Sequence, residues 1–167
     1  MKKLLLLIPL FLFTGFNISD SYYPMIMSRS DLEASVQLTN VARPLTNPGK
    51  IYLYKNWIFL VEKYKGIHLI DNADPSNPVR RAFLRVPGCM DVVVGNGILY
   101  VDNAVDLVAV DLDFARLTAK VVSRKIRALP EIVSPYGYIP DEYSRGKRPA
   151  NTEIVGWISN VNDSYSN

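Results

Sequence analysis

The sequence predicts an all-β protein with a short N-terminal helix and about two propeller-like repeats, each a four-stranded antiparallel blade, in an incomplete propeller. Three observations support this prediction: a sequence repeat about forty residues long, apolar runs of strand length, and turn residues between those runs. About forty residues is the usual length of one four-stranded propeller blade.

The repeat joins two separate apolar segments at one offset. Residues 56–62 match residues 96–102, and residues 67–71 match residues 107–111. Because both pairs keep the same spacing, chance similarity is a poor explanation, and two copies of one structural unit are expected. We place these units at residues 51–88 and 89–129.

Within each unit, four runs rich in β-branched and aromatic residues predict four strands. The predicted strands are residues 51–54, 57–62, 66–71 and 79–86 in the first unit and residues 91–94, 98–102, 106–111 and 119–126 in the second. Turn residues separate them, including Lys55-Asn56, Gly95-Asn96-Gly97 and the proline-containing segment 72–78. The inner strands are continuously apolar, so we expect both of their faces to be covered. The connections are too short for the crossover helices of a parallel sheet.

The segments on either side of the repeats are predicted to be less regular. Residues 22–50 form a lead-in, in which Ser30 and Glu33 have the spacing of a capping box and predict a short helix. Residues 42–50 contain two prolines and predict an extended connector. Residues 130–167 are predicted to form a long loop, a last strand at residues 152–158 and a polar tail.

Residues 1–21 have the pattern of an export signal. Lys2 and Lys3 precede the apolar run 4–13, which is too short to span a bilayer comfortably. An uncleaved membrane anchor and a buried core helix are the alternatives. The segment 12–16 is similar to a bacterial lipobox, but Phe16 stands where lipidation needs a cysteine, so no lipid anchor is expected there. We predict export to the periplasm, the cell envelope or the medium.

The segments 66–78 and 106–111 resemble the LVIVD repeat, which is named for an apolar strand that ends in aspartate. The resemblance covers residues 27–157 and includes Val86-Pro87-Gly88 and the closing Ile154-Val155-Gly156-Trp157. Proteins of this family look like exported bacterial β-propellers, often lipoproteins of the cell envelope. The resemblance therefore implies an exported propeller-like protein, and it supplies no catalytic residues.

The chain departs from that family at Phe16 and in the number of its repeats. Closed propellers need at least four blades, whereas this chain has about two repeats. We expect the open blade faces to be covered by the lead-in and the C-terminal loop, by another copy of the chain in a homo-oligomer, or not at all, in which case further blades are missing and the chain is a truncated fragment.

Composition and charge argue against several functions. A net charge of +3 gives little reason to expect nucleic acid binding. Cys89 is the single cysteine and cannot form an intramolecular disulfide. His68 is the single histidine and lies in an apolar strand, so a hydrogen-bonded histidine of the core or the sheet surface is expected in place of a triad member or metal ligand. Oxygens in segment 71–77 could bind calcium, but the same spacing suits Asx turns. We predict no cofactor and no metal.

One aromatic and basic stretch suggests a binding surface. Its side chains could stack on a sugar ring or meet an acidic partner, and packing of an ordinary loop is the alternative. The candidate residues are Tyr136, Tyr138, Tyr143, Arg145 and Arg148. We predict a non-enzymatic exported interaction or scaffold module of the bacterial cell envelope, with an unknown protein or glycan as partner. The alternatives are a glycan-active enzyme or hydrolase assembled from several chains, and a truncated remnant without independent function.

Overall fold

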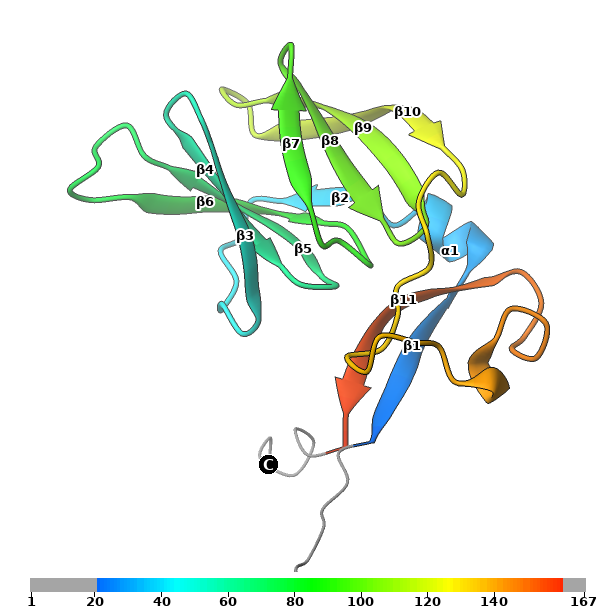
Figure 1. The fold of residues 1–167 in the computed structure, drawn as a ribbon. Coiled ribbons are helices and arrows are strands. Elements are labelled where there is room, and N and C mark those ends of the chain that lie inside the picture. The colour runs from blue at the N-terminus through cyan, green and yellow to red at the C-terminus, as the bar shows by residue number, and fades with distance from the viewer. Residues whose placement is uncertain (1–20, 161–167) are drawn as a thin grey trace, which may run out of the picture.

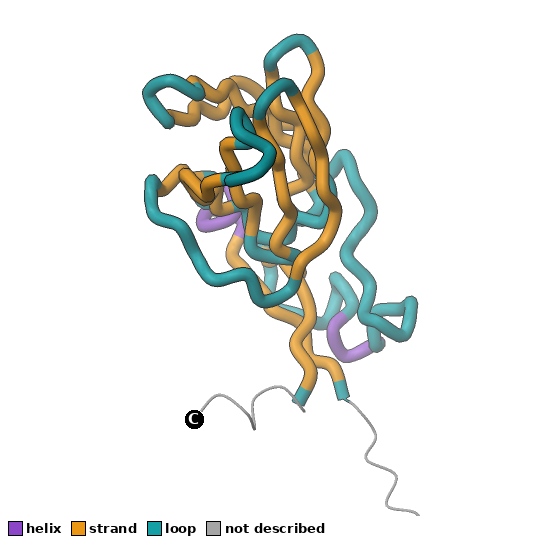
Figure 2. Tube along the Cα trace, turned by 90° about the vertical axis from the view of Figure 1, so that its left-hand side faces the viewer, coloured by secondary structure: helices purple, strands orange, loops and turns teal. Residues whose placement is uncertain are grey.

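The computed structural model describes residues 21–160, which form two antiparallel sheets and a separate two-stranded ribbon (Figures 1 and 2). The predicted all-β class is therefore confirmed. The predicted export signal lies outside the described residues, apart from Ser21. No helix among residues 21–160 is long and apolar enough to span a bilayer.

The strands fall into three groups (Figure 1). The five-stranded sheet has the order β2-β6-β5-β4-β3, the four-stranded sheet has the order β10-β9-β8-β7, and β1 pairs with β11 in the ribbon. The elements are β1 (Tyr22–Ser28), α1 (Arg29–Glu33), β2 (Gln37–Thr39), β3 (Pro48–Tyr54), β4 (Trp57–Glu62), β5 (Gly66–Asp71), β6 (Val79–Arg85), β7 (Val92–Gly95), β8 (Ile98–Asn103), β9 (Asp106–Asp113), β10 (Thr118–Lys125), the 3-10 helix η1 (Asp141–Tyr143) and β11 (Thr152–Ser159).

The strands of the repeats lie close to their predicted positions, and the turns explain why. Lys55-Asn56 and Asn96-Gly97 each form a two-residue hairpin turn. Lys55, Asn96 and Gly97 have positive φ angles of 53°, 51° and 81°, which are typical of the turns that match the twist of a hairpin.

The lead-in is more regular than the sequence predicts. Its first residues form β1, which pairs with β11 from the far end of the chain, and β2 adds a fifth strand beside β6. The short helix is present, but its N-cap is Ser28, whose hydroxyl accepts the Asp31 N–H at 3.1 Å, and not Ser30. The predicted connector also ends early, because Pro48 already begins β3.

The two units share one topology, a meander of four consecutive strands, but their register differs by one residue. Trp57 lies opposite Asp71 in the first unit, and Ile98 lies opposite Asp111 in the second. The offset is therefore 40 residues from β5 to β9 (111 minus 71) and 41 from β4 to β8 (98 minus 57). The turn between the two inner strands has three residues (63–65) in the first unit and two (104–105) in the second. This difference of one residue accounts for the change in offset from 41 to 40.

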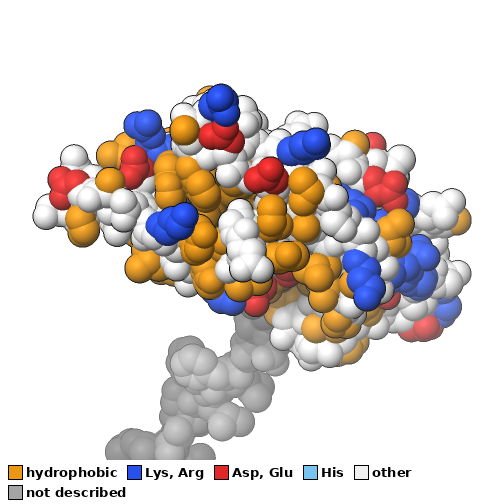
Figure 3. Space-filling view, turned by 90° about the horizontal axis from the view of Figure 1, so that it is seen from above, with side chains coloured by type: hydrophobic (Ala, Val, Ile, Leu, Met, Phe, Trp, Pro, Cys, Tyr) orange, Lys and Arg blue, Asp and Glu red, His pale blue; other side chains and the backbone are white. Residues whose placement is uncertain are grey.

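One apolar core lies between the two sheets. Its buried members include Phe59, Val61, Ile67, Leu69 and Leu84 from the five-stranded sheet and Val92, Leu99, Val101, Val108 and Val110 from the four-stranded sheet. Tyr54, Trp57 and Phe114 are partly buried against this core. On the molecular surface seen from above, Figure 3 shows hydrophobic side chains gathered near the middle of the view, with charged side chains around them.

The register shift determines which way each unit faces. Side chains alternate between the two faces of a strand. Phe59 faces the core, whereas its register equivalent Tyr100 lies between the core residues Leu99 and Val101 and therefore faces away from it. The face of the first unit that packs in the core is therefore equivalent to the face of the second unit that points away from the core. The two units are stacked in the same direction. Neither described sheet closes on itself, and the propeller-like arrangement stays a prediction.

The ribbon extends away from the sheets (Figure 2) and contacts them at one end. Leu32, Ala104 and Val155 form a small second core there. Gly156 of β11 lies against the β4–β5 turn, since a Cβ atom at this position would lie 2.6 Å from Cγ of Tyr64 and 2.5 Å from Cε of Met25. The close approach therefore requires glycine.

We predict that Gly156→Ala lowers the free energy of unfolding by about 1 to 3 kcal/mol, because the added methyl group has no space. Urea denaturation followed by circular dichroism measures this loss. Gly146→Ala is the matched control, since a Cβ atom there meets no atom within 4 Å. Equal stability of the two variants would show that the Tyr64–Gly156 contact does not constrain the ribbon.

Candidate functional site

The described residues contain a tyrosine-lined hollow of about 530 Å³ between the ribbon and the C-terminal loop. We call it the tyrosine hollow. Its lining residues are Ser21, Tyr22, Tyr23, Ser134, Tyr136, Tyr138, Pro140, Glu142 and Tyr143. Three of these are candidates from the sequence, namely Tyr136, Tyr138 and Tyr143. Tyr22 and Tyr23 come from β1, more than one hundred residues earlier in the chain.

Three of the five rings of the tyrosine hollow form a connected aromatic surface. The rings of Tyr136 and Tyr138 are nearly parallel, with an interplanar angle of 24° and centroids 6.2 Å apart. Tyr22 meets Tyr136 edge to face at 5.3 Å. Tyr136 and Tyr138 are 51% and 56% exposed, so much of this surface is open to a ligand.

Short-range hydrogen bonds shape the loop that carries two of these rings. The Gly137 N–H donates to the Ser134 carbonyl at 2.8 Å, and the Ser134 hydroxyl donates to the Tyr138 carbonyl at 2.7 Å. Gly137 has a φ of 84°, which favours glycine at this tight turn. The turn places Tyr136 and Tyr138 on either side of Gly137.

Contacts with Trp157 of β11 hold the same loop against the ribbon. The Trp157 indole N–H donates to the Ile132 carbonyl at 3.0 Å. The ring of Tyr143 meets the Trp157 ring edge to face at 6.3 Å. The loop is therefore fixed to β11 on both sides of the Tyr136–Tyr138 turn.

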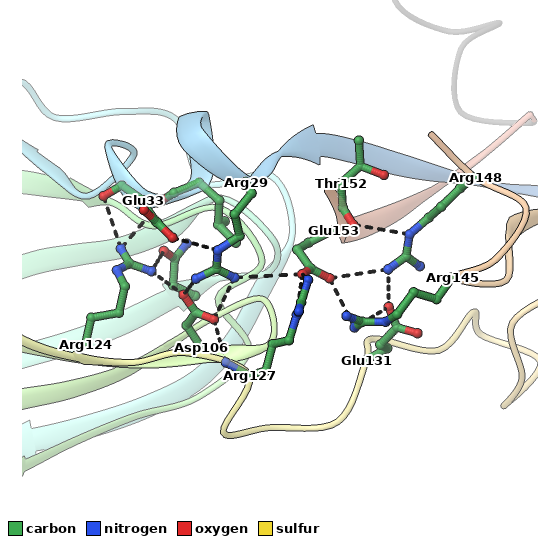
Figure 4. A network of polar contacts seen from close by, with 12 residues as sticks. Arg29, Glu33, Asp106, Arg124, Arg127, Glu131, Arg145, Arg148, Thr152 and Glu153 are labelled. Carbon is green, nitrogen blue, oxygen red and sulfur yellow. Dashed lines mark hydrogen bonds and ion pairs between the residues drawn. The ribbon is translucent and has the colours of Figure 1, made fainter. Parts of the chain in front are cut away.

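The two candidate arginines lie outside the lining of the hollow, in ion pairs with Glu131 and Glu153 (Figure 4). The Arg148 side chain is only 1% exposed and bonds both carboxylates. Arg145 is 45% exposed and lies 3.0 Å from Glu131 and 3.2 Å from Glu153. Arg148 therefore fixes the loop from inside, and Arg145 presents part of its side chain to solvent.

Figure 4 shows that these pairs belong to a larger network, which we call the arginine network. At its other end, Asp106 has no exposed side-chain surface and is bonded by Arg29 at 2.9 Å and by Arg124 at 2.7 Å. Arg29 also lies 3.8 Å from Glu153, which is equally buried. The network thus joins the ribbon, the four-stranded sheet and the C-terminal loop.

The charge of Asp106 is stabilised by these donors. Burial alone would raise the pKa of its carboxyl group, but bonds from the Arg29 side chain, the Arg127 backbone N–H and the Arg124 side chain lower it below the usual range. The same carboxylate raises the pKa of the Arg29 guanidinium. Asp106 is therefore an anion at neutral pH despite its burial.

A third buried carboxylate, Glu62, fixes the lead-in. Burial would raise its pKa, but the Thr46 hydroxyl and the backbone N–H groups of Asn47 and Thr46 lower it. The Glu62 Oε2 atom also lies 3.3 Å from Nε2 of His68, which is 1% exposed. His68 is therefore buried on the outer face of the five-stranded sheet, where its ring meets the Phe83 ring edge to face at 4.9 Å.

The remaining candidates have structural contacts. Asp71 accepts the Ala73 N–H at 3.1 Å, and Asp74 accepts the Ser76 N–H at 3.0 Å, which are Asx-turn bonds. Cys89 is buried, and burial raises the pKa of its thiol well above the usual value. Within residues 21–160, no three histidine, cysteine or acidic side chains lie close enough together to hold a metal ion.

We predict that Glu153→Gln lowers the free energy of unfolding by about 3 kcal/mol or more, because it removes one of the two carboxylates that the buried Arg148 side chain contacts and leaves excess positive charge out of water. Chemical denaturation measures the loss. Glu33→Gln is the matched control: Glu33 also pairs with Arg29, at 2.8 Å, but is 45% exposed. Its loss should be about 0.5 kcal/mol or less. A similar loss in both variants would refute the special role of the buried carboxylate.

We also predict that stability falls in acid as Asp106 is protonated. Its pKa is lower in the folded protein than in the unfolded chain, so the ionised form contributes stability at neutral pH. This contribution is lost as the pH falls through the folded-state pKa. In denaturation at several values from about pH 6 to about pH 2, Asp106→Asn should be less stable at the upper end and less sensitive to acid. An unchanged pH slope would contradict the assignment.

No protein-family model, no curated protein and no solved structure was found to match this chain. The resemblance to the LVIVD repeat therefore stays a prediction from the sequence.

Proposed function

We propose that this protein is a non-enzymatic, exported interaction module of the bacterial cell envelope that binds a glycan in the tyrosine hollow. The observation that carries the proposal is the convergence of five tyrosines, from two distant parts of the chain, on one open hollow. Ligand sites typically combine an apolar or aromatic lining with a few polar groups.

The chemistry of the hollow suits a sugar ring. A pyranose presents C–H groups on its faces and hydroxyl groups on its rim, so it packs on an aromatic surface while it forms hydrogen bonds at its edges. Tyr136 and Tyr138 offer the surface, and their own hydroxyl groups provide polar ends. Glu142, which also lines the hollow, can accept hydrogen bonds from sugar hydroxyls.

The rest of the chain supports a scaffold role. We propose that the two stacked meanders are blade-like repeats, since they have the same strand order and face in the same direction. The signal-like residues 1–21 and the resemblance to an exported family support the location in the envelope. A scaffold of this kind places a binding surface without contributing chemistry of its own.

The direct test is binding of envelope polysaccharides and their fragments, measured by isothermal titration calorimetry. Tyr136→Ala and Tyr138→Ala should each weaken binding by about tenfold or more, which corresponds to roughly 1.4 kcal/mol of lost contact. Ile126→Ala is the control, because Ile126 is 56% exposed just after β10 and does not line the hollow.

The same samples separate a binding protein from an enzyme. We expect the bound glycan to be recovered unchanged after long incubation. Release of shorter fragments by the folded protein would favour the alternative of a glycan-active enzyme. If the protein binds a peptide but no glycan, and the tyrosine variants bind that peptide about tenfold more weakly, the tyrosine hollow is the binding site but its ligand is not a glycan.

A further inference from the structure

The interface between the two sheets is formed by two different faces. The five-stranded sheet contributes the face that carries Phe59 and Leu69, and the four-stranded sheet contributes the face that carries Leu99 and Val110. Because the units are stacked in the same direction, each of these faces has a register equivalent on the outer side of the other sheet.

The outer face of the five-stranded sheet corresponds to the buried face of the four-stranded sheet. Ile58, Leu60 and Ile70 occupy the register positions of Leu99, Val101 and Val110. They are half-buried, and beside them on β3 Ile51 and Leu53 are 67% and 62% exposed. The lead-in covers the rest of this face near β6, where Arg43 lies over the Phe83 ring.

The outer face of the four-stranded sheet corresponds to the buried face of the five-stranded sheet. Tyr100 and Ala109 take the register positions of Phe59 and Leu69, and Leu107 takes that of Ile67. Tyr100 and Leu107 are 37% and 36% exposed, and Val93 on β7 is 46% exposed. The two outer faces of the stack are therefore different. One is equivalent to the buried face of the four-stranded sheet, and the other is equivalent to the buried face of the five-stranded sheet.

The internal interface also indicates which residues would meet. Within the chain, the Tyr52 hydroxyl of β3 donates to the Val94 carbonyl of β7 at 3.3 Å. Val93 is the register equivalent of Tyr52, and Leu53 is the register equivalent of Val94. A contact of the same geometry between two molecules would place Val93 of one beside Leu53 of the next.

We propose that the protein associates with further copies of itself, head to tail, through the outer face of the five-stranded sheet of one copy and the outer face of the four-stranded sheet of the next. This contact between copies would resemble the interface between the two sheets within one chain. Because its two faces differ, the contact is heterologous. It produces a ring if successive copies return to the first one, and a filament if they do not. This proposal does not depend on the tyrosine hollow.

Analytical ultracentrifugation of the full chain over a wide range of concentration tests the proposal. We expect the average mass of the wild type to rise with concentration or to settle at a closed oligomer. Leu53→Glu and Val93→Glu should each abolish growth, since each places a charge on one of the two faces. Val133→Glu is the matched control, because Val133 is 46% exposed in the C-terminal loop, away from both faces.

Mixing the two variants distinguishes head-to-tail contact from symmetric contact. Each variant keeps one intact face, and the intact faces are complementary, so the mixture should form a dimer that grows no further. A symmetric contact through one face would be lost in only one variant, and mixing would not alter the associating species. Near-UV circular dichroism of each variant checks that the core is native.

A cross-linking experiment keeps the proposal falsifiable if a charged variant fails to fold. Val93→Cys and Leu53→Cys should be joined by a short thiol cross-linker when the two are mixed, with little competition from the buried thiol of Cys89. A wild type that stays monomeric at every concentration, association of Leu53→Glu equal to that of the wild type, or no cross-linked product would each overturn the proposal.

Discussion

The burial of two carboxylates, Asp106 and Glu153, determines how the parts of this protein are held together. Neither has exposed side-chain surface. Removing an ion from water costs several kcal/mol unless charged partners and hydrogen bonds offset the loss. The partners are arginines from α1, β10 and the C-terminal loop, and Arg29 lies between the two carboxylates. A displacement of the ribbon or the loop would separate these charges from their partners, so the network opposes such a movement.

The arginine network connects two regions, the tyrosine hollow and the stack of two sheets, that are stabilised by different interactions. The stack is held by apolar burial, and its open faces follow from the register of β8 and β9. The hollow is held by charges and by Trp157, since its rings come from β1 and from the loop between β10 and β11. A change in one region can therefore leave the other intact, which allows binding and assembly to be studied independently.

The sequence predicts the eight strands of the two repeats well because their signals are local. Apolar runs and turns such as Asn96-Gly97 are readable without knowledge of distant residues. β1 was missed because its partner β11 lies at the other end of the chain and Pro24 interrupts its pattern. For the same reason the sequence finds Tyr136, Tyr138 and Tyr143 but not Tyr22 and Tyr23. Asp106 and Glu153 resemble surface charges in sequence. Asp106 is the first residue of β9 and Glu153 is the second residue of β11, and this position at the start of an apolar strand is a signal that could have identified them.

The buried thiol has a practical consequence for the chain outside a reducing compartment. Cys89 lies in the core between the sheets, and burial keeps its sulfur protonated. A protonated, inaccessible sulfur exchanges slowly with disulfides, so the folded chain can pass through an oxidising environment without forming covalent dimers. Labelling of this single sulfur also becomes a direct gauge of how often the two sheets separate.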